Sequence, residues 1–403
     1  MKENMVKCDV DYNLLQKIIH LKPDKVIAKN IQCEEILKNK FSAGEEVVLY
    51  GAGRIGKLFK VILEKQGVKV KGMLDKNAVK ICKEDVFLPE DYIVEKSNKS
   101  VTVLITLCQS IKSVEKIVSY LNSLGYKKIV YDYHLMGCFC DFSMYQQEEV
   151  FLSEHEEKIK MVYSMLADEH SKEIFCACLK HYVTNNVYDT LESVNGCQYF
   201  DVDIPFSKGY ASFVDCGAYN GDTLTNLVDL KECKTYIGFE PDMRNFQELE
   251  ECINLIDESQ KPEEILLYPC ALSDKNEYLS FAMEEESKSS SHIKTRGGQC
   301  VTVFGVKLDD VLKRKKIDFI KMDIEGAEIH ALKGAKNIIS IQNPDLAICV
   351  YHKVTDIWEI PIMLKEMCNK YSFYLRTYSP GAGETVLYAT IKQDIAQNKS
   401  IVY

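Results

Sequence analysis

The feature that most constrains the fold is the stretch of residues 213–223, Phe-Val-Asp-Cys-Gly-Ala-Tyr-Asn-Gly-Asp-Thr. An apolar run ends in Asp215, a turn carries Gly217 and Gly221, and a helical pattern starts near Asp222. In a doubly wound sheet, this order places a glycine turn and an acidic side chain at the carboxyl edge of the first strand, where such folds bind ligands. The turn lacks the close Gly-x-Gly pair that lets a backbone approach a pyrophosphate. The stretch therefore favours a cationic or hydroxylated ligand over a phosphate.

The apolar segment 235–239 ends in a second acid, Glu240. A carboxylate at the end of the second strand of such a sheet can accept the hydroxyls of a ribose. Glu240, Asp215 and the glycine turn together predict a site for S-adenosylmethionine (SAM). The alternative that the residues leave open is that both acids are surface carboxylates at strand ends.

Five segments in the second half of the chain resemble, in order, the FkbM family of SAM-dependent methyltransferases. They are FVDCGAYNGDTL, IGFEPD, YPCALSD, IDFIKMDIEGAE and VYHKVTDIWEIPIMLK. The resemblance implies an α/β class I methyltransferase fold with a seven-stranded doubly wound sheet. It also implies that SAM is the cofactor and that a hydroxyl of a sugar, a glycan precursor or a natural product is methylated.

The resemblance further implies which residues bind SAM. The turn after Asp215 lies beside the methionine portion and its ammonium, Glu240 takes the ribose hydroxyls, and the segment after the third strand flanks the adenine. The implied cofactor-binding residues are Asp215, Gly217, Ala218, Tyr219, Gly221, Asp222, Thr223, Glu240, Pro241, Ala271 and Leu272. For Asp222 and Thr223, capping of the helix alone is the alternative.

Methyl transfer to a hydroxyl also requires that its proton be removed, to which a general base contributes about 10²–10⁴-fold. Asp323 and Glu325 follow a strand expected at 317–322, on the edge that carries the glycine turn. His352 follows the next strand, and an unperturbed imidazole titrates near pH 6.5. We expect the three side chains to converge beside Gly217, with His352 or Glu325 as the base. A structural hydrogen-bonding role is the alternative for His352, and no metal is predicted, because no histidine pair accompanies the acids.

A second glycine motif lies in the first half of the chain. Gly51-Ala52-Gly53-Arg54-Ile55-Gly56 follows a strand expected at 45–50, opens a helix, and precedes Asp75 at the end of the next strand. This is the dinucleotide fingerprint in its proper context. Glycines also allow tight packing of a strand against a helix, and no hydride-transfer constellation follows. The alternative function is therefore a nucleotide- or nucleotide-sugar-binding, dehydrogenase-like protein that acts through this segment.

Alternating strand and helix patterns predict three parts. These are a Rossmann-like α/β domain with N-terminal helices (1–140), a helical linker or cap (141–195) and a SAM-dependent methyltransferase domain (196–403). Strands of the last part are expected at 212–215, 235–239, 265–270, 317–322, 345–351, 371–378 and 386–390, the last two as a hairpin. The polar stretch 284–299 predicts a loop over the acceptor, where His292 and Arg296 can contact substrate.

Composition limits the partners. A net charge of −10 argues against nucleic acid, because no basic excess exists to neutralise phosphates. The apolar runs fall short of the roughly 20 residues of a membrane span. Sixteen scattered cysteines without a Cys-x-x-Cys pair, in a chain that opens without an export signal, predict a reducing, cytoplasmic environment. The expected partner is a small-molecule or glycan acceptor, and the oligomeric state is left open.

Overall fold

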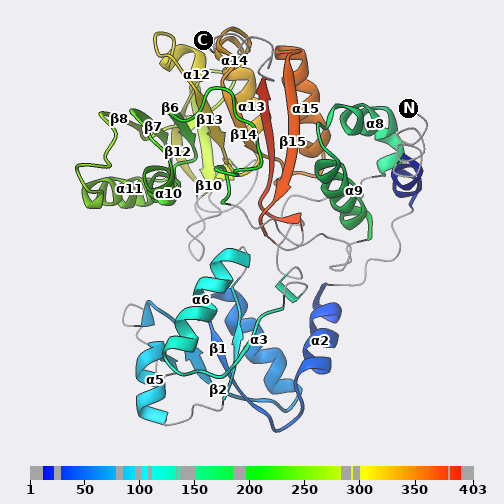
Figure 1. Ribbon diagram of the computed structural model, residues 1–403, viewed down its shortest axis with the longest axis vertical. Helices are drawn as coiled ribbons and strands as arrows, with labels where there is room; N and C mark the ends of the chain where they lie inside the picture. The colour runs from blue at the N-terminus through cyan, green and yellow to red at the C-terminus, as the bar shows by residue number, and fades with distance from the viewer. Residues whose placement is uncertain are drawn as a thin grey trace, which may run out of the picture. The chain divides into compact units, whose positions relative to one another are not determined.

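The computed structural model describes residues 12–21, 29–78, 85–96, 101–107, 111–132, 135–136, 151–184, 197–282, 292–293, 300–379 and 382–391. The chain forms two compact units. In Figure 1, most of the first unit is blue to cyan and most of the second is green to red. The first takes its described residues from Met1–Glu154, Glu173–Gly196 and Thr377–Glu384, and the second takes them from His155–Lys172, Cys197–Arg376 and Thr385–Tyr403. The three domain limits expected from the sequence stay predictions.

The first unit contains a five-stranded sheet in the order β3-β2-β1-β4-β5, with every neighbouring pair parallel. Its strands are β1 (Glu46–Tyr50), β2 (Lys69–Leu74), β3 (Val86–Phe87), β4 (Thr102–Ile105) and β5 (Lys128–Val130). Its helices include α2 (Lys29–Lys40), α3 (Arg54–Lys65), α5 (Pro89–Lys96) and α6 (Ile111–Ser123). Two core clusters show that α2 and α3 cover one face and α5 and α6 the other. This confirms the predicted doubly wound α/β fold, although the sequence analysis missed β3 and α5.

The second unit contains a seven-stranded sheet in the order β15-β16-β14-β13-β6-β7-β8. Its strands are β6 (Ser212–Cys216), β7 (Thr235–Phe239), β8 (Glu264–Tyr268), β13 (Phe319–Met322), β14 (Asp345–Cys349), β15 (Tyr371–Thr377) and β16 (Thr385–Ile391). The strands from β14 to β8 are parallel, and β16 runs antiparallel to β14. All seven predicted strands are confirmed, with ends that differ by up to two residues.

Most helices of the second unit lie between its strands in the chain, and α8 (Glu156–Met165) precedes them. The helices between the strands are α10 (Asp222–Leu230), α11 (Met243–Leu255), α12 (Leu308–Val311), α13 (Glu328–Gly334), α14 (Lys336–Gln342) and α15 (Asp356–Met367). Helix α9 (Glu169–Thr184) contributes residues to both units. The strand order reverses at β6, which lies between β7 and β13, so the crevice at the carboxyl ends of β6 and β13 is the expected ligand site.

A second, four-stranded sheet lies in the segment between β8 and β13 and was missed by the sequence analysis. It has the order β11-β10-β12-β9, with β9 (Ala271–Leu272), β10 (Glu277–Ala282), β11 (His292–Ile293) and β12 (Cys300–Val306). The predicted loop at 284–299 is therefore wrong for His292, which belongs to a strand, while Arg296 lies outside the described residues. Among the described residues, no helix is long and apolar enough to cross a membrane.

Candidate cofactor and catalytic site

The glycine turn after β6 is shaped by close backbone packing. Gly217, Tyr219 and Gly221 have φ values of +86°, +47° and +89°, in the left-handed region that favours glycine. A Cβ atom on Gly217 would lie 1.9 Å from the carbonyl oxygen of Asp323, and one on Gly221 would lie 2.8 Å from Cys252 Sγ. Only glycine fits these two positions, so the turn lies directly against the end of β13.

Glu240 connects this turn to the end of β7. The side chain is buried, Oε2 accepts a hydrogen bond from Tyr219 N at 3.0 Å, and Oε1 accepts one from Asp242 N at 2.8 Å. Burial raises the pKa of Glu240, although the two backbone N–H groups oppose the shift. The alternative from the sequence, that Glu240 is a surface carboxylate, is wrong, because its side chain is buried. The side chain of Asn245 gives the carboxylate a third hydrogen bond. A carboxylate has about four acceptor sites, so one remains for a ligand hydroxyl.

Asp215 lies below the turn and is wholly buried. Its Oδ1 lies 3.0 Å from Lys321 Nζ, and its Oδ2 accepts a hydrogen bond from Tyr236 Oη at 2.8 Å. Lys321 Nζ also donates to the carbonyl oxygen of Gly217 at 2.6 Å. Burial lowers the pKa of Lys321, but Asp215 and Asp323 more than offset it, so the lysine stays charged. Asp215 thus holds the turn through a buried ion pair, and its contact with the methionine ammonium stays a prediction.

The other predicted cofactor residues lie around this turn. Ala218 is buried, Asp222 is exposed, and Asp222 Oδ1 accepts a hydrogen bond from Thr223 N at 2.7 Å at the start of α10. The N-cap residue is Gly221, so Asp222 satisfies one backbone N–H of the first turn from within the helix, while the contact gives no capping role to the Thr223 side chain. Ala271 and Leu272 are buried in β9, and Pro241 is half-buried directly after Glu240. Their contacts with SAM stay predictions.

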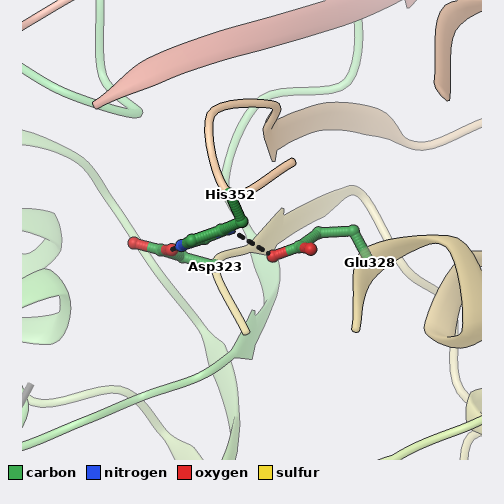
Figure 2. Close-up of side chains that lie close together, drawn as sticks. All are labelled: Asp323, Glu328 and His352. Carbon is green, nitrogen blue, oxygen red and sulfur yellow. Dashed lines mark ion pairs between the residues drawn. The ribbon is translucent and has the colours of Figure 1, made fainter. Parts of the chain in front are cut away.

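The structure brings Asp323 and Glu325 close to His352, and Figure 2 shows His352 with Asp323 and Glu328. His352 Nε2 lies 3.4 Å from Asp323 Oδ1 and 3.6 Å from Glu325 Oε2, while Nδ1 lies 2.9 Å from Glu328 Oε1. Asp323 follows β13, Glu325 lies in the next turn, Glu328 begins α13 and His352 follows β14. Because Asp323 also contacts the turn at Gly217, the expected convergence at this edge of the sheet is observed.

Glu325 has a strained backbone. Its φ of +55° is rare for a residue with a Cβ atom, and it is followed by Gly326 at +90°. Such strain costs on the order of 1–3 kcal/mol and clusters at functional sites. The strained turn directs the Glu325 side chain towards His352, so the arrangement of the cluster is favoured at the expense of local stability.

The electrostatics of the cluster differ from the sequence-based expectation. Burial alone lowers the pKa of His352, but Glu328, Asp323 and Glu325 outweigh it and raise the pKa to about 10. Burial alone would raise the pKa of Asp323, but His352, Lys321 and the hydroxyl of Tyr199 outweigh it and hold this pKa below its ordinary value. The expected titration of His352 near pH 6.5 is wrong for this geometry, because three carboxylates stabilise the imidazolium.

Several functional residues were missed in the sequence. Tyr199 Oη donates to Asp323 Oδ2 at 2.8 Å, and Tyr351 Oη donates to Asp323 Oδ1 at 3.3 Å. Lys321 carried a usable signal, since a lysine inside a buried strand requires a charged partner. Tyr199 carried none, because its contact joins residues 124 positions apart in the chain.

The glycine motif of the first unit also has a structural explanation. A Cβ atom on Gly56 would lie 1.9 Å from the carbonyl oxygen of Gly51, so α3 approaches the end of β1 closely. Asp75 Oδ2 accepts a hydrogen bond from Ala52 N at 3.0 Å, and Oδ1 accepts one from Asn77 N at 2.8 Å. These contacts account for the motif as packing, and nucleotide binding there stays a prediction.

Comparisons with known proteins agree with the second unit. Residues 215–396 match the family model of the methyltransferase FkbM domain. The fold is similar to the methyltransferase FkbM from Methylobacillus flagellatus KT, with 18% identity, a TM-score of 0.55, and coverage of 94% of this chain and 98% of that chain. No curated protein matches the chain significantly in sequence.

Two further solved structures are less similar. An rRNA methylase from Streptococcus thermophilus has 13% identity and a TM-score of 0.30, and covers 46% of this chain and 90% of that one. The fibrillarin pre-rRNA processing protein of Methanococcus jannaschii has 14% identity and a TM-score of 0.27, with 46% and 67% covered. These two likenesses are too weak to support an argument about the acceptor. The match of residues 215–396 to the methyltransferase FkbM domain, together with the similar fold, supports a methyltransferase enzyme.

Proposed function

We propose that this methyltransferase uses SAM and methylates a hydroxyl group of a sugar, a glycan precursor or a natural product. The observation that carries the proposal is the buried Glu240 at the end of β7. Both of its oxygens are fixed by backbone N–H groups, one of them from the glycine turn, and Asn245 gives a third hydrogen bond. The remaining acceptor site of this buried carboxylate fits a hydroxyl of a ribose.

The same edge of the sheet offers groups for the acceptor. SAM supplies a methyl group that is open to attack by an oxygen nucleophile. The side chains of Asp323 and Glu325 are 21% and 26% exposed, whereas His352 is 2% exposed. We therefore assign contact with the acceptor hydroxyl to the two carboxylates and a positioning role to His352. As the oxygen–methyl bond forms and the sulfur–methyl bond breaks, the hydroxyl proton passes to a carboxylate, and Glu325 is the better placed because Asp323 already accepts two tyrosine hydrogen bonds.

The acceptor class follows from charge as well as from the resemblance. The chain carries a net charge of −10, which opposes binding to a phosphate backbone. A neutral polyhydroxylated acceptor meets no such repulsion from Asp323 and Glu325, and its hydroxyls donate to carboxylates. This argument supports a glycan or small-molecule acceptor over a nucleic acid.

Calorimetric titration with S-adenosylhomocysteine tests the cofactor site. Glu240→Ala should weaken binding about 10–100-fold, because it removes hydrogen bonds to a charged acceptor worth about 1.5–3 kcal/mol. The matched control is Asp75→Ala, since Asp75 accepts a glycine-turn N–H in the first unit as Glu240 does in the second. Asp75→Ala should leave this affinity unchanged. Equal affinity of folded Glu240→Ala and wild type would remove the ribose assignment.

The same control addresses the alternative function in the first unit. If the Gly51–Gly56 motif binds a nucleotide, titration with NADH or a UDP-sugar should show binding that Asp75→Ala weakens. Binding of this kind without any response to S-adenosylhomocysteine would favour the alternative over the proposal.

A further inference from the structure

We propose that the carboxyl edge of β13 and β14 binds a divalent metal ion through His352 Nε2, Asp323 and Glu325. Metal binding itself does not depend on the proposed methyltransfer to a hydroxyl, whereas the role given to the metal below does. The sequence predicts no metal because it shows no histidine pair, but the fold adds a histidine and a buried glutamate from separate elements to the two acids.

The spacing of the ligand atoms fits a metal ion. Two metal–ligand bonds of about 2.1 Å at tetrahedral or octahedral angles place their ligand atoms about 3.0–3.4 Å apart. His352 Nε2 lies 3.4 Å from Asp323 Oδ1 and 3.6 Å from Glu325 Oε2. Ligand atoms of Asp323, Glu328 and His352 lie within 4.8 Å of one another, and Glu328 is on the Nδ1 side of the ring, away from the proposed ion. A contraction of a few tenths of an ångström would complete this coordination.

Glu328 supports the ligand histidine from behind. It is wholly buried, its Oε1 lies 2.9 Å from His352 Nδ1, and the same oxygen accepts a hydrogen bond from Ile324 N at 3.0 Å. A carboxylate on the distal nitrogen is the usual second partner of a metal-bound histidine, because it fixes the tautomer and the ring orientation. With Nδ1 held by Glu328, the other nitrogen is directed to Asp323 and Glu325 (Figure 2 shows the imidazole between Asp323 and Glu328).

Buried charge gives a second, independent reason for a cation. Glu328 Oε2 is buried and has no hydrogen-bond partner among the described residues. The carboxylate of Asp356 is also buried and accepts a hydrogen bond from the backbone of Lys353. Asp356 interacts electrostatically with both Glu328 and His352. Buried carboxylates of this kind are retained where a cation compensates them. The cations near the four acids here are the imidazolium, Lys353, whose Nζ donates to the carbonyl oxygen of Gly326, and Lys321, which is shared between Asp323 and Asp215.

The mixed donor set indicates the type of metal and its use. One imidazole nitrogen and two carboxylates suit Mn²⁺ or Zn²⁺ better than Ca²⁺, which prefers oxygen ligands alone. Three protein ligands leave coordination positions open on the partly exposed side of Asp323 and Glu325. A hydroxyl of the acceptor bound there would lose its proton more readily, since a metal ion lowers the pKa of a coordinated oxygen. The proton would pass to the carboxyl oxygen of Glu325 that does not bind the metal.

Calorimetry with the full chain, treated with EDTA and dialysed, tests the site. We expect MnCl₂ or ZnCl₂ to bind with a stoichiometry of one. His352→Gln and Glu325→Gln should each weaken that binding at least 100-fold, and Glu328→Gln about 10–100-fold. The matched control is His330→Gln, because His330 lies 3.7 Å from Asp274 on the surface of the same unit. It should leave the affinity unchanged.

Two outcomes overturn the proposal: no binding of either ion by the wild type, or binding that Glu325→Gln and His352→Gln do not weaken. Glu325 is partly exposed, so its variant stays informative if His352→Gln fails to fold. Titration of the same samples with S-adenosylhomocysteine separates the two proposals. Cofactor binding without metal binding refutes the metal site alone, and metal binding without cofactor binding refutes the cofactor assignment alone.

Discussion

The buried ion pair below the glycine turn provides the sharpest test of how the site is held together. The side chains of Lys321 and Asp215 are 3% and 0% exposed, and their charged atoms lie 3.0 Å apart. Removal of one partner of a buried pair leaves an uncompensated charge and costs about 3–5 kcal/mol. Lys321→Met should therefore lower the free energy of unfolding of the second unit by about that amount.

The chain offers a specific probe for this measurement. Its single tryptophan, Trp358, is buried in α15 within the second unit. Tryptophan fluorescence during unfolding in guanidinium chloride thus reports on this unit. With a denaturant slope of about 2–6 kcal/mol per molar, the expected loss moves the midpoint by roughly 1 M.

Two further variants decide whether the charge is the cause. Lys234→Met removes an exposed lysine that is paired with Glu232, and should cost at most about 1 kcal/mol. The double variant Asp215→Asn with Lys321→Met removes both charges of this pair, and should be more stable than Lys321→Met alone by about 1 kcal/mol or more. The reasoning is refuted if Lys321→Met lowers the free energy of unfolding no more than Lys234→Met does. It is also refuted if the loss in the double variant equals the sum of the losses in Lys321→Met and in Asp215→Asn measured separately.

Two other predictions concern packing and pH. Gly56→Ala should destabilise the first unit by about 1–3 kcal/mol, because the new Cβ would lie 1.9 Å from the carbonyl oxygen of Gly51. Gly53→Ala should be tolerated, because no heavy atom lies within 4 Å of the position of its Cβ. Thermal melting followed by circular dichroism checks this, and a neutral Gly56→Ala would contradict it. Burial raises the pKa of Asp168, but hydrogen bonds from Arg376 and Ser171 hold it below 3.8. Asp168→Asn should therefore lower the free energy of unfolding by about 1–3 kcal/mol at pH 7. Unfolding followed by tryptophan fluorescence should show that the difference between variant and wild type shrinks as the pH falls below 3.8. A difference that stays constant with pH would exclude the carboxylate as its source.

The strands and the place of the site could be predicted because both depend on local patterns. Apolar runs that end in an acid or a glycine turn mark strands and their carboxyl ends, and parallel strands bring those ends to one edge. Asp323, Glu325 and His352 follow neighbouring strands, so their convergence followed from topology alone. The four-stranded sheet could not be predicted in this way, because its strand β10 pairs with β12 across a long polar segment.

The chemistry of the site was harder to predict than its position. The pKa of His352 depends on Glu328, a residue that sequence alone assigns only to the start of a helix. The ionisation of Asp323 depends on Tyr199 and Lys321, which come from other segments. A pKa is set by the sum of distances to all charges around a group, and a sequence does not contain those distances.

The two glycine motifs of the chain show which features distinguish a ligand site from tight packing. In both units, a glycine lies so close to a carbonyl oxygen that no Cβ fits, and in both a turn N–H donates to an acid at the end of the second strand. These shared features report close backbone packing, of a helix in the first unit and of a neighbouring strand end in the second, and cannot by themselves identify a ligand. What differs is the rest of the edge. Among the described residues, the group able to hold a metal ion occurs in the second unit, at His352, and not beside the Gly51–Gly56 turn. Reactive groups that gather at the sheet edge, rather than the glycine pattern, are thus the reason to place the chemistry in the second unit.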